Sequence, residues 1–400
     1  MLTAEQNDLY TRVGPGTPCG DLMRRYWHPI STVSEMKNHY TEPVRLLGED
    51  LVLYKDRSGT YGLVATQCAH RRMGMIYAMP DERGLRCSYH GWLYDETGQC
   101  IEQPFEDAED PDGRFKEKVW IKAYPVEAVG GLIFAYLGPL PAPLVPRWDW
   151  LVMEDVVRDA EYTELPANWL QCQENSLDSL HVEWLHGHFA NYIEEMKGAP
   201  VRPGRTRTHA KVGFDVFEYG IYKRHGYADA ADDHTRWADG HPIVFPNTLR
   251  QFGDGFDRER WAGNAGPGAQ IRVPIDDTHT GHWRVRCYRR PEGEAPQALD
   301  DVLFKITPIS MLDERGQPQW DKIDYTMPQD FSAWWTQGEI ADRTQEVLGR
   351  SDTGIILFRQ MLDENIKLVQ DGGDPMNTFR DPKQNVYLGM RTEDSRVFNA

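Results

Sequence analysis

Cysteine is scarce in this chain. Six of the 400 residues are cysteines, and they are scattered at positions 19, 68, 87, 100, 172 and 287. A small secreted domain held together by disulfides would carry cysteines more densely, so that class of protein is excluded. The scarcity favours a reducing compartment, and we expect a cytoplasmic protein.

Long apolar runs and an excess of positive charge are also missing. No stretch approaches the roughly 20 apolar residues of a membrane-spanning helix. The opening residues MLTAEQNDLYTRVG lack the basic and apolar parts of a signal peptide, so none is expected. The formal net charge is −18, whereas proteins that bind nucleic acids concentrate Lys and Arg. Neither a nucleic acid nor a membrane is therefore an expected partner.

The chain is long enough for two domains, and its 13 Trp, 18 Tyr and 14 Phe can fill a sizeable core. Short β-type runs separated by glycine-containing turns occupy residues 44–66 and return before residue 137. A proline-rich stretch, residues 139–146, marks a domain boundary. These features predict a small antiparallel β-domain in the first third of the chain.

The remainder mixes helical and β-type patterns. We expect helices at 168–195, 330–349 and 354–370, strands at 207–224, 269–275, 282–289 and 302–311, and long loops at 226–268. A short helix at 3–13 should begin at Thr3, with Gln6 completing a capping box. This pattern predicts an α+β fold whose helices lie on one side of an antiparallel sheet.

Two short loops each carry one cysteine and one histidine. Cys68-x-His70 and Cys87-x-x-His90 are separated by sixteen residues. A zinc site usually pairs its cysteines in one loop and its histidines in another. One cysteine and one histidine in each loop suits a two-iron cluster in which one iron takes the thiolates and the other takes the imidazoles, which is Rieske ligation. A structural zinc site is the alternative.

A second group of candidate ligands lies on the expected helix at 168–195. It contains Asp178, His181, His186 and His188. Taken alone, an aspartate and three histidines on one helix do not specify a metal site, because buried or solvated histidines are common. His181 and His186 would stand about 140° apart on a regular helix, which is poor geometry for one metal. A π-bulge or a helix end near Gly187 would bring them together, and His188 is the alternative second ligand.

Several segments resemble Rieske non-haem iron oxygenases that hydroxylate aromatic rings. The matching stretches are CAHRRMGM, CSYHGWLYDETGQC, GGLIFAYLGP and the pattern EN-x-x-D-x-x-H-x4-H. LTAEQNDLYTRVGPGTPCGDLMRRYW and ADRTQEVLGRSDTGIILFRQML are similar to the branch that includes phthalate dioxygenase and dehydrodivanillate O-demethylase. The resemblance implies an N-terminal helical segment (1–40), a Rieske domain (41–145) and a helix-grip catalytic domain (146–400).

The resemblance also implies roles for single residues. Cys68, His70, Cys87 and His90 would hold a [2Fe-2S] cluster, and His181 and His186 would bind a mononuclear Fe(II) beside Asp178 and Asn175. The third iron ligand would be Asp330, which precedes Gln337 by seven residues as in the family. Asp330 could equally be a helix cap, and the other candidates for the third ligand are Asp324, Asp342 and Asp352.

An enzyme of this family would use O2 and electrons that a separate reductase draws from NADH, through a flavin, a ferredoxin or both. We expect O-demethylation of a methoxylated aromatic acid with release of formaldehyde, and cis-dihydroxylation of a phthalate- or benzoate-type acid is the alternative. The alternatives outside this enzyme class are a Rieske electron carrier and a zinc-stabilised binding protein. The family implies a homotrimer or two stacked trimers. Five cations are available to pair with a substrate carboxylate, and each can also be explained as an ordinary surface charge. They are Arg205, Arg207, Lys223, Arg224 and Arg250.

Overall fold

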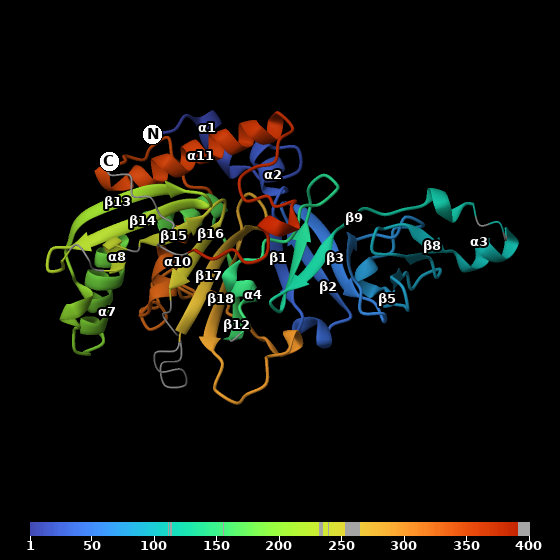
Figure 1. Cartoon of the computed structure of the whole chain (residues 1–400), viewed down its shortest axis with the longest axis horizontal. Helices are drawn as coiled ribbons and strands as arrows, with labels where there is room; N and C mark the ends of the chain where they lie inside the picture. The colour runs from blue at the N-terminus through green and yellow to red at the C-terminus, as the bar shows by residue number, and fades with distance from the viewer. Residues whose placement is uncertain are drawn as a thin grey trace.

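Four β-sheets form the frame of the part of the chain that the structure describes. The structure is a computed structural model that describes residues 1–110, 112, 114–154, 156–231, 235–238, 240–252 and 265–390. Along the longest axis of the molecule, the small sheet that contains β5 and β8 lies at one end and the large sheet extends toward the other (Figure 1).

The first third of the chain builds three small antiparallel sheets. Their strands are β1 (Trp27–Thr32), β11 (Leu132–Tyr136) and β10 (Val126–Val129); β2 (Thr41–Leu46), β3 (Glu49–Lys55), β4 (Tyr61–Ala65) and β9 (Ala123–Tyr124); and β5 (Met79–Pro80), β6 (Leu85–Arg86), β7 (Leu93–Tyr94) and β8 (Cys100–Glu102). A separate core of buried side chains, among them Val52, Tyr54, Leu85 and Trp92, fills the space between the last two of these sheets. The predicted antiparallel β-structure in this part is confirmed.

The large sheet has eight strands in the order β13-β14-β15-β16-β17-β18-β12-β19. Their bounds are β12 (Val156–Leu165), β13 (His209–Phe217), β14 (Gly220–Tyr227), β15 (His241–Val244), β16 (Thr248–Phe252), β17 (Ala265–Pro274), β18 (Thr280–Arg289) and β19 (Leu303–Ile306). Adjacent strands are antiparallel except at one edge, where β19 pairs parallel with β12. The connection after β18 passes β12, and β19 joins the sheet on the far side of β12. There it runs parallel to β12.

The helices are α1 (Ala4–Thr11), α2 (Pro18–Met23), α3 (Pro104–Glu109), α4 (Asp149–Val152), α5 (Trp169–Glu174), α6 (His181–Glu183), α7 (Ala190–Met196), α8 (Thr235–Ala238), α10 (Thr326–Thr336) and α11 (Thr353–Gln370). The strand register places Phe214 and Gln270 on the same face of the large sheet. Gly354 of α11 packs against Phe214, and Met327 of α10 contacts Gln270. The α+β class is confirmed, and α10 and α11 lie on one side of the sheet as predicted. The short helix α4 instead contacts the opposite face, where Asp149 pairs with Arg250 and the carbonyl of Trp150 accepts from Cys287.

Several predicted boundaries were wrong. The capping box at Thr3 and Gln6 is present, but the helix predicted at 330–349 ends at Thr336, just before Gly338, whose φ is +96°. Residues 226–268, predicted as loops, contain β15, β16 and the start of β17, while residues 253–264 lie outside the described part. The strands were missed because Gly, Asp, His and Pro interrupt their apolar pattern.

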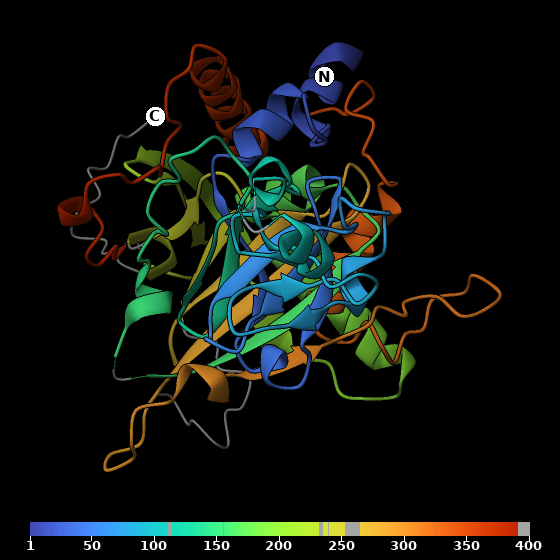
Figure 2. The same ribbon diagram turned by 90° about the vertical axis from the view of Figure 1, so that its right-hand side faces the viewer.

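The N-terminal helices and α11 lie together on one side of the molecule (Figures 1 and 2). The backbone N–H of Leu2 donates to the carbonyl of Arg343, and the Arg343 guanidinium donates to Asn7 of α1. Arg343 and Arg359 also donate to the carboxylate of Glu174 at the end of α5, with contacts of 2.7 Å from each. This buried charge cluster ties α1, α5 and α11 to one another.

Replacing Glu174 with glutamine should destabilise the fold strongly. Buried Arg343 would lose its carboxylate partner and Arg359 would keep only Glu346, and leaving a buried charge without its partner costs about 3–5 kcal/mol in the free energy of unfolding. Urea unfolding followed by tryptophan fluorescence measures the loss. Glu314→Gln, at an exposed position, is the matched control and should stay within about 0.5 kcal/mol of the wild type. An equally stable Glu174→Gln variant would contradict this account.

The same variant should show a defined pH dependence. Burial raises the pKa of Glu174, but Arg343 and Arg359 outweigh it and hold that pKa below its ordinary value. A carboxyl group with a lowered pKa in the folded state stabilises the fold above its unfolded pKa and loses that contribution as pH falls through the folded one. The stability difference between wild type and Glu174→Gln should therefore be constant above about pH 5 and shrink at lower pH.

No helix within the described residues is both long enough and apolar enough to cross a membrane.

Candidate metal centres

The two cysteine–histidine loops lie in the small-sheet part, one between β4 and β5 and the other between β6 and β7. Cys68 and Cys87 are buried, whereas His70 and His90 are exposed. The rings of the two histidines lie 4.4 Å apart, centroid to centroid. The four predicted ligands are thus divided into an inner pair of thiols and an outer pair of imidazoles, the division that Rieske ligation requires.

Backbone hydrogen bonds and packing hold both loops in shape. The N–H of Cys68 donates to the carbonyl of Met73, and the N–H of Gly91 donates to that of Cys87. Gly91 has a φ of +79°, which favours glycine at this tight turn. Trp92 stacks on the His70 ring at 4.4 Å, so ring packing and backbone hydrogen bonds both hold the loops.

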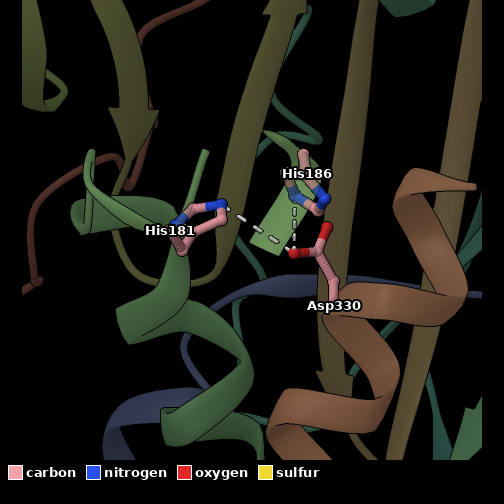
Figure 3. A group of neighbouring side chains, drawn as sticks. All are labelled: His181, His186 and Asp330. Carbon is pink, nitrogen blue, oxygen red and sulfur yellow. Dashed lines mark ion pairs between the residues drawn. The ribbon is translucent and has the colours of Figure 1, made fainter. Parts of the chain in front are cut away.

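The second group of ligands brings together two elements far apart in the sequence. His181 and His186 come from the segment after α5, and Asp330 comes from α10 (Figure 3). Oδ1 of Asp330 lies 3.0 Å from Nε2 of His186 and 3.8 Å from Nε2 of His181. One ligand atom from each residue lies within 4.8 Å of the other two. Two imidazoles and one carboxylate on one side of a site are the ligand set of many non-haem Fe(II) enzymes.

A π-helix accounts for the five-residue spacing of the histidines. It covers Trp184–Phe189, between α6 and α7. Its wider turn brings residues five apart onto one face, which a regular helix would not do. Gly187 lies inside it, and a Cβ at this position would meet the carbonyl oxygen of Arg205 at 2.5 Å. A glycine is therefore required for the close approach of the 203–206 segment.

The environment of Asp330 fits a metal ligand. The residue is buried, and its Oδ1 makes no hydrogen bond of good geometry with any described residue. Burial raises the pKa of Asp330, but His186, His181 and Arg272 together lower it below its ordinary value. A buried ionised oxygen that lacks a hydrogen-bond donor is costly unless a cation compensates it. The donor set therefore fits a divalent cation.

The residues around these three orient them. Oε1 of Gln329 lies 2.9 Å from Nδ1 of His186, and Oδ2 of Asp178 lies 3.4 Å from Nδ1 of His181. Asp178 also accepts a hydrogen bond from the N–H of Leu180. Nδ1 of His186 is hydrogen-bonded to a protein oxygen and Nδ1 of His181 lies near one, while both Nε2 atoms lie on the side of Asp330. Metal-binding histidines are commonly held in this way. Gln329 could not be predicted from the sequence beyond its place next to Asp330.

The other candidates lie elsewhere. His188 stacks on Trp184, and Asp324 pairs with Lys197. Asp342 accepts hydrogen bonds within its own turn, as does Asp352. Asn175 is half-buried, and its backbone carbonyl accepts a hydrogen bond from the N–H of Asp178, so it precedes the ligands without a described side-chain contact to them.

The cations considered for a substrate carboxylate fall into two groups. Arg224 and Arg250 are buried and pair with Asp215 and Asp149, so they are not surface charges. The ammonium of Lys223, also buried, donates to the carbonyl of Asp178. Arg205 and Arg207 instead line a cavity of about 220 Å³ that reaches His186. The other residues that line it are Val182, Glu183, Gly204, His209 and Tyr227.

Comparison with known proteins adds independent evidence. Residues 26–125 match the family model of the Rieske [2Fe-2S] domain, and residues 317–388 match that of the LigXa C-terminal domain like family. The chain is 43% identical, over 98% of its length and 87% of the relative's, to the 5,5'-dehydrodivanillate O-demethylase oxygenase subunit of Sphingobium sp. (strain NBRC 103272 / SYK-6). It is 32% identical to the phenoxybenzoate dioxygenase subunit alpha of Ectopseudomonas oleovorans, over 91% of the chain and 85% of that protein.

Solved structures share the fold. NdmA of Pseudomonas putida CBB5 superimposes with a TM-score of 0.62 at 18% identity, covering 88% of this chain and 93% of the other. The terminal oxygenase of carbazole 1,9a-dioxygenase from Novosphingobium sp. KA1 gives a TM-score of 0.60 at 18% identity, covering 89% and 97%. The chain is more than 30% identical to two oxygenase subunits over most of their lengths, and it carries a matching Rieske domain. It therefore belongs to the Rieske non-haem iron oxygenases of aromatic compounds.

Proposed function

We propose that this protein is the terminal oxygenase of a multicomponent system that demethylates a methoxylated aromatic acid and releases formaldehyde. The observation that carries the proposal is the 43% identity over nearly the whole chain to a subunit of an aromatic O-demethylase. Ring cis-dihydroxylation is the second candidate, because the phenoxybenzoate and phthalate 4,5-dioxygenase subunits are also full-length relatives, the latter at 29% identity.

The proposed roles follow the geometry of the two centres. Cys68, Cys87, His70 and His90 hold the [2Fe-2S] cluster, and His181, His186 and Asp330 hold a mononuclear iron that supplies the activation of O2. The protein residues supply the rest: Gln329 orients the imidazole of His186, and Asp178 orients that of His181. Asn175, whose carbonyl accepts from the N–H of Asp178, is assigned to the same site.

The domain division we propose is 1–40, 41–145 and 146–400. The bonds from Leu2 and Asn7 to the 341–343 segment support packing of the N-terminal helices on the catalytic domain. The six cysteines are unpaired, which supports a reducing compartment such as the cytoplasm. A separate reductase with a flavin, a ferredoxin or both would supply electrons from NADH.

A homotrimer, alone or as two stacked trimers, is the proposed assembly. The cluster loops border β5–β8, which lie at one end of the longest axis, whereas α7, which continues the segment that carries His181 and His186, lies toward the other (Figure 1). Centres at such different places in one chain suit electron transfer between neighbouring subunits. Asp178 and His90 both have solvent-exposed surface, which supports a contact between them across a subunit boundary.

Metal content and product analysis test the function. The purified protein should hold two cluster irons and one further iron per chain; two irons alone would indicate an electron carrier, and colourless zinc protein would indicate neither. With a reductase and NADH, O2 uptake should accompany formaldehyde release from one or more methoxylated aromatic acids in a panel. Formation of a cis-dihydrodiol without formaldehyde would instead establish the dioxygenase function.

Replacing His90 with cysteine should lower the reduction potential of the cluster. Two imidazoles place Rieske clusters at about −150 to +300 mV, whereas all-cysteine plant-type clusters lie near −400 mV. We expect a decrease of at least about 100 mV in the variant that assembles its cluster, measured by redox titration of the visible spectrum. His39→Cys, at an exposed histidine outside the cluster loops, is the control. An unchanged potential would remove His90 from the ligand set.

A further inference from the structure

A cavity of about 570 Å³ lies between strands β2 and β3 and the large sheet, which stand side by side in Figure 1. We call it the inter-sheet cavity. Its volume falls within the roughly 300–1,000 Å³ of most ligand pockets. Neither proposed metal centre contributes a ligand to its walls.

The inter-sheet cavity is on the face of the large sheet that points away from the iron centre. Gln270 faces α10, the helix that carries Asp330, so its neighbour Ile271 in β17 faces the other way. Ile271 is paired with Trp283 of β18, which lines the cavity. The sheet therefore separates a ligand in this cavity from Asp330.

Apolar and aromatic side chains form most of the walls. Val44 and Leu46 of β2 line one side. On the other side the ring of Trp283 lies 5.0 Å from that of Tyr162 and stacks on that of Phe304 at 5.6 Å, and Tyr162 and Phe304 are both partly exposed. Such a wall takes the apolar part of a ligand, and the faces of its rings also attract a cation.

The charged side chains that line the cavity leave it with an excess of negative charge. Arg45 donates to Asp50 at 2.7 Å and to Asp276 at 3.1 Å, so its charge is already compensated. Glu42 accepts a hydrogen bond from Ser31 at 2.6 Å, but neither Glu42 nor Glu164 forms an ion pair with a Lys or Arg in the described part of the chain. Two carboxylates thus remain without a cation.

Both of these carboxylates act on the aromatic wall. Burial raises the pKa of Tyr162, and Glu164 and Glu42 raise it further because each disfavours a second negative charge nearby. Burial also raises the pKa of Glu42, and neither the hydrogen bond from Ser31 nor the nearby His39 offsets this effect. A cation bound beside Tyr162 would compensate both carboxylates.

We propose that the inter-sheet cavity is a second ligand site, which binds a hydrophobic organic ammonium ion. The apolar part of the ligand packs on Tyr162 and Phe304, and its ammonium group lies between Glu42 and Glu164. The site is separate from the iron centre and does not depend on the demethylase function. Its two carboxylates repel an aromatic acid, the substrate class proposed for the iron centre, so the two sites select ligands of opposite charge.

A ligand in this cavity also contacts the first cluster loop. Thr66 and Ile76, which flank the loop that carries Cys68 and His70, both line the cavity. The N–H of Met75 donates to the carbonyl of Thr66 at 2.8 Å and closes the loop at this point. The ligand therefore bridges the large sheet and the cluster-bearing part of the chain, and it binds only when both are folded.

Probes that differ mainly in charge test this assignment. Naphthylmethylammonium is compared with naphthylmethanol, which has the same ring system and nearly the same size but no charge. Dissociation constants are measured by calorimetric titration of the metal-loaded protein at constant ionic strength. Wild type should bind the ammonium probe roughly tenfold more tightly, because two partly exposed ion pairs form with it. Naphthoate, the anionic probe, should not displace it.

Two charge-neutralising variants locate the bound probe. Glu164→Gln and Glu42→Gln should each weaken binding of the ammonium probe about threefold and leave binding of the alcohol unchanged, and the double variant should bind the two probes equally. Glu164 is exposed, so its variant tests the site even if Glu42→Gln does not fold. Glu314→Gln, at an exposed position away from the cavity, is the matched control and should bind both probes as wild type does.

Three results would overturn the proposal. They are equal binding of the two probes by wild type, a preference for the ammonium probe that persists in Glu164→Gln at its wild-type size, and displacement of that probe by naphthoate. The last result would place the probe in a site that accepts anions. None of these measurements uses formaldehyde release, so the second site can stand or fall without the demethylase function.

Discussion

Asp330→Ala should lose the mononuclear iron and nearly all turnover while keeping the visible spectrum of the cluster. The carboxylate is the proposed iron ligand on α10, and its Oδ1 lies 3.0 Å from Nε2 of His186. Without it two imidazoles remain, too few for a stable three-ligand iron site. We expect a decrease in kcat of at least about a thousandfold, equivalent to roughly 4 kcal/mol.

The cluster should be unaffected because its loops belong to a different sheet with a separate core. The measured iron content should therefore fall from three irons per chain to two. Asp324→Ala is the control, since Asp324 pairs with Lys197 at the protein surface and should keep all three irons. Full iron content and activity in Asp330→Ala would mean that the third ligand is another carboxylate.

The cluster loops could be predicted from the sequence because their geometry is local. Cys68 and His70 lie in one loop and Cys87 and His90 in another, so the spacing alone indicates the chemistry. The antiparallel small sheets follow from short β-type runs and glycine-containing turns in the same way. In this part of the chain the local sequence patterns agree with the three-dimensional structure.

The iron site was harder to predict because it depends on a helical irregularity and a long-range contact. Side-chain periodicity does not encode the π-helix Trp184–Phe189, which is needed to align His181 with His186. Gln329 meets His186 across 143 residues of sequence, and the fold alone brings them together. The short strands β15 and β16 were missed for a related reason, since pairing with neighbouring strands outweighs their weak intrinsic preference for β-structure.

Asp178→Asn should retain both metals and the fold but lose at least about a hundredfold in turnover. The carboxylate faces Nδ1 of His181 at 3.4 Å, and its side chain is 28% exposed, so it can contact a second imidazole from outside the chain. Burial raises the pKa of Asp178, but His181, the N–H of Leu180 and Lys223 lower it below its ordinary value. An ionised carboxylate between two imidazoles orients both, whereas an amide is a weaker acceptor.

The proposed second imidazole is that of His90 in a neighbouring subunit, so the variant should be impaired in electron transfer rather than in metal binding. In a single-turnover experiment the pre-reduced cluster of Asp178→Asn should stay reduced when substrate and O2 are added, whereas that of wild type should be oxidised. Asp371→Asn, at an exposed aspartate that pairs with Lys367, is the control and should behave as wild type. Rapid cluster oxidation in Asp178→Asn, with product formed at the wild-type rate, would exclude Asp178 from the electron path and leave it only the orientation of His181.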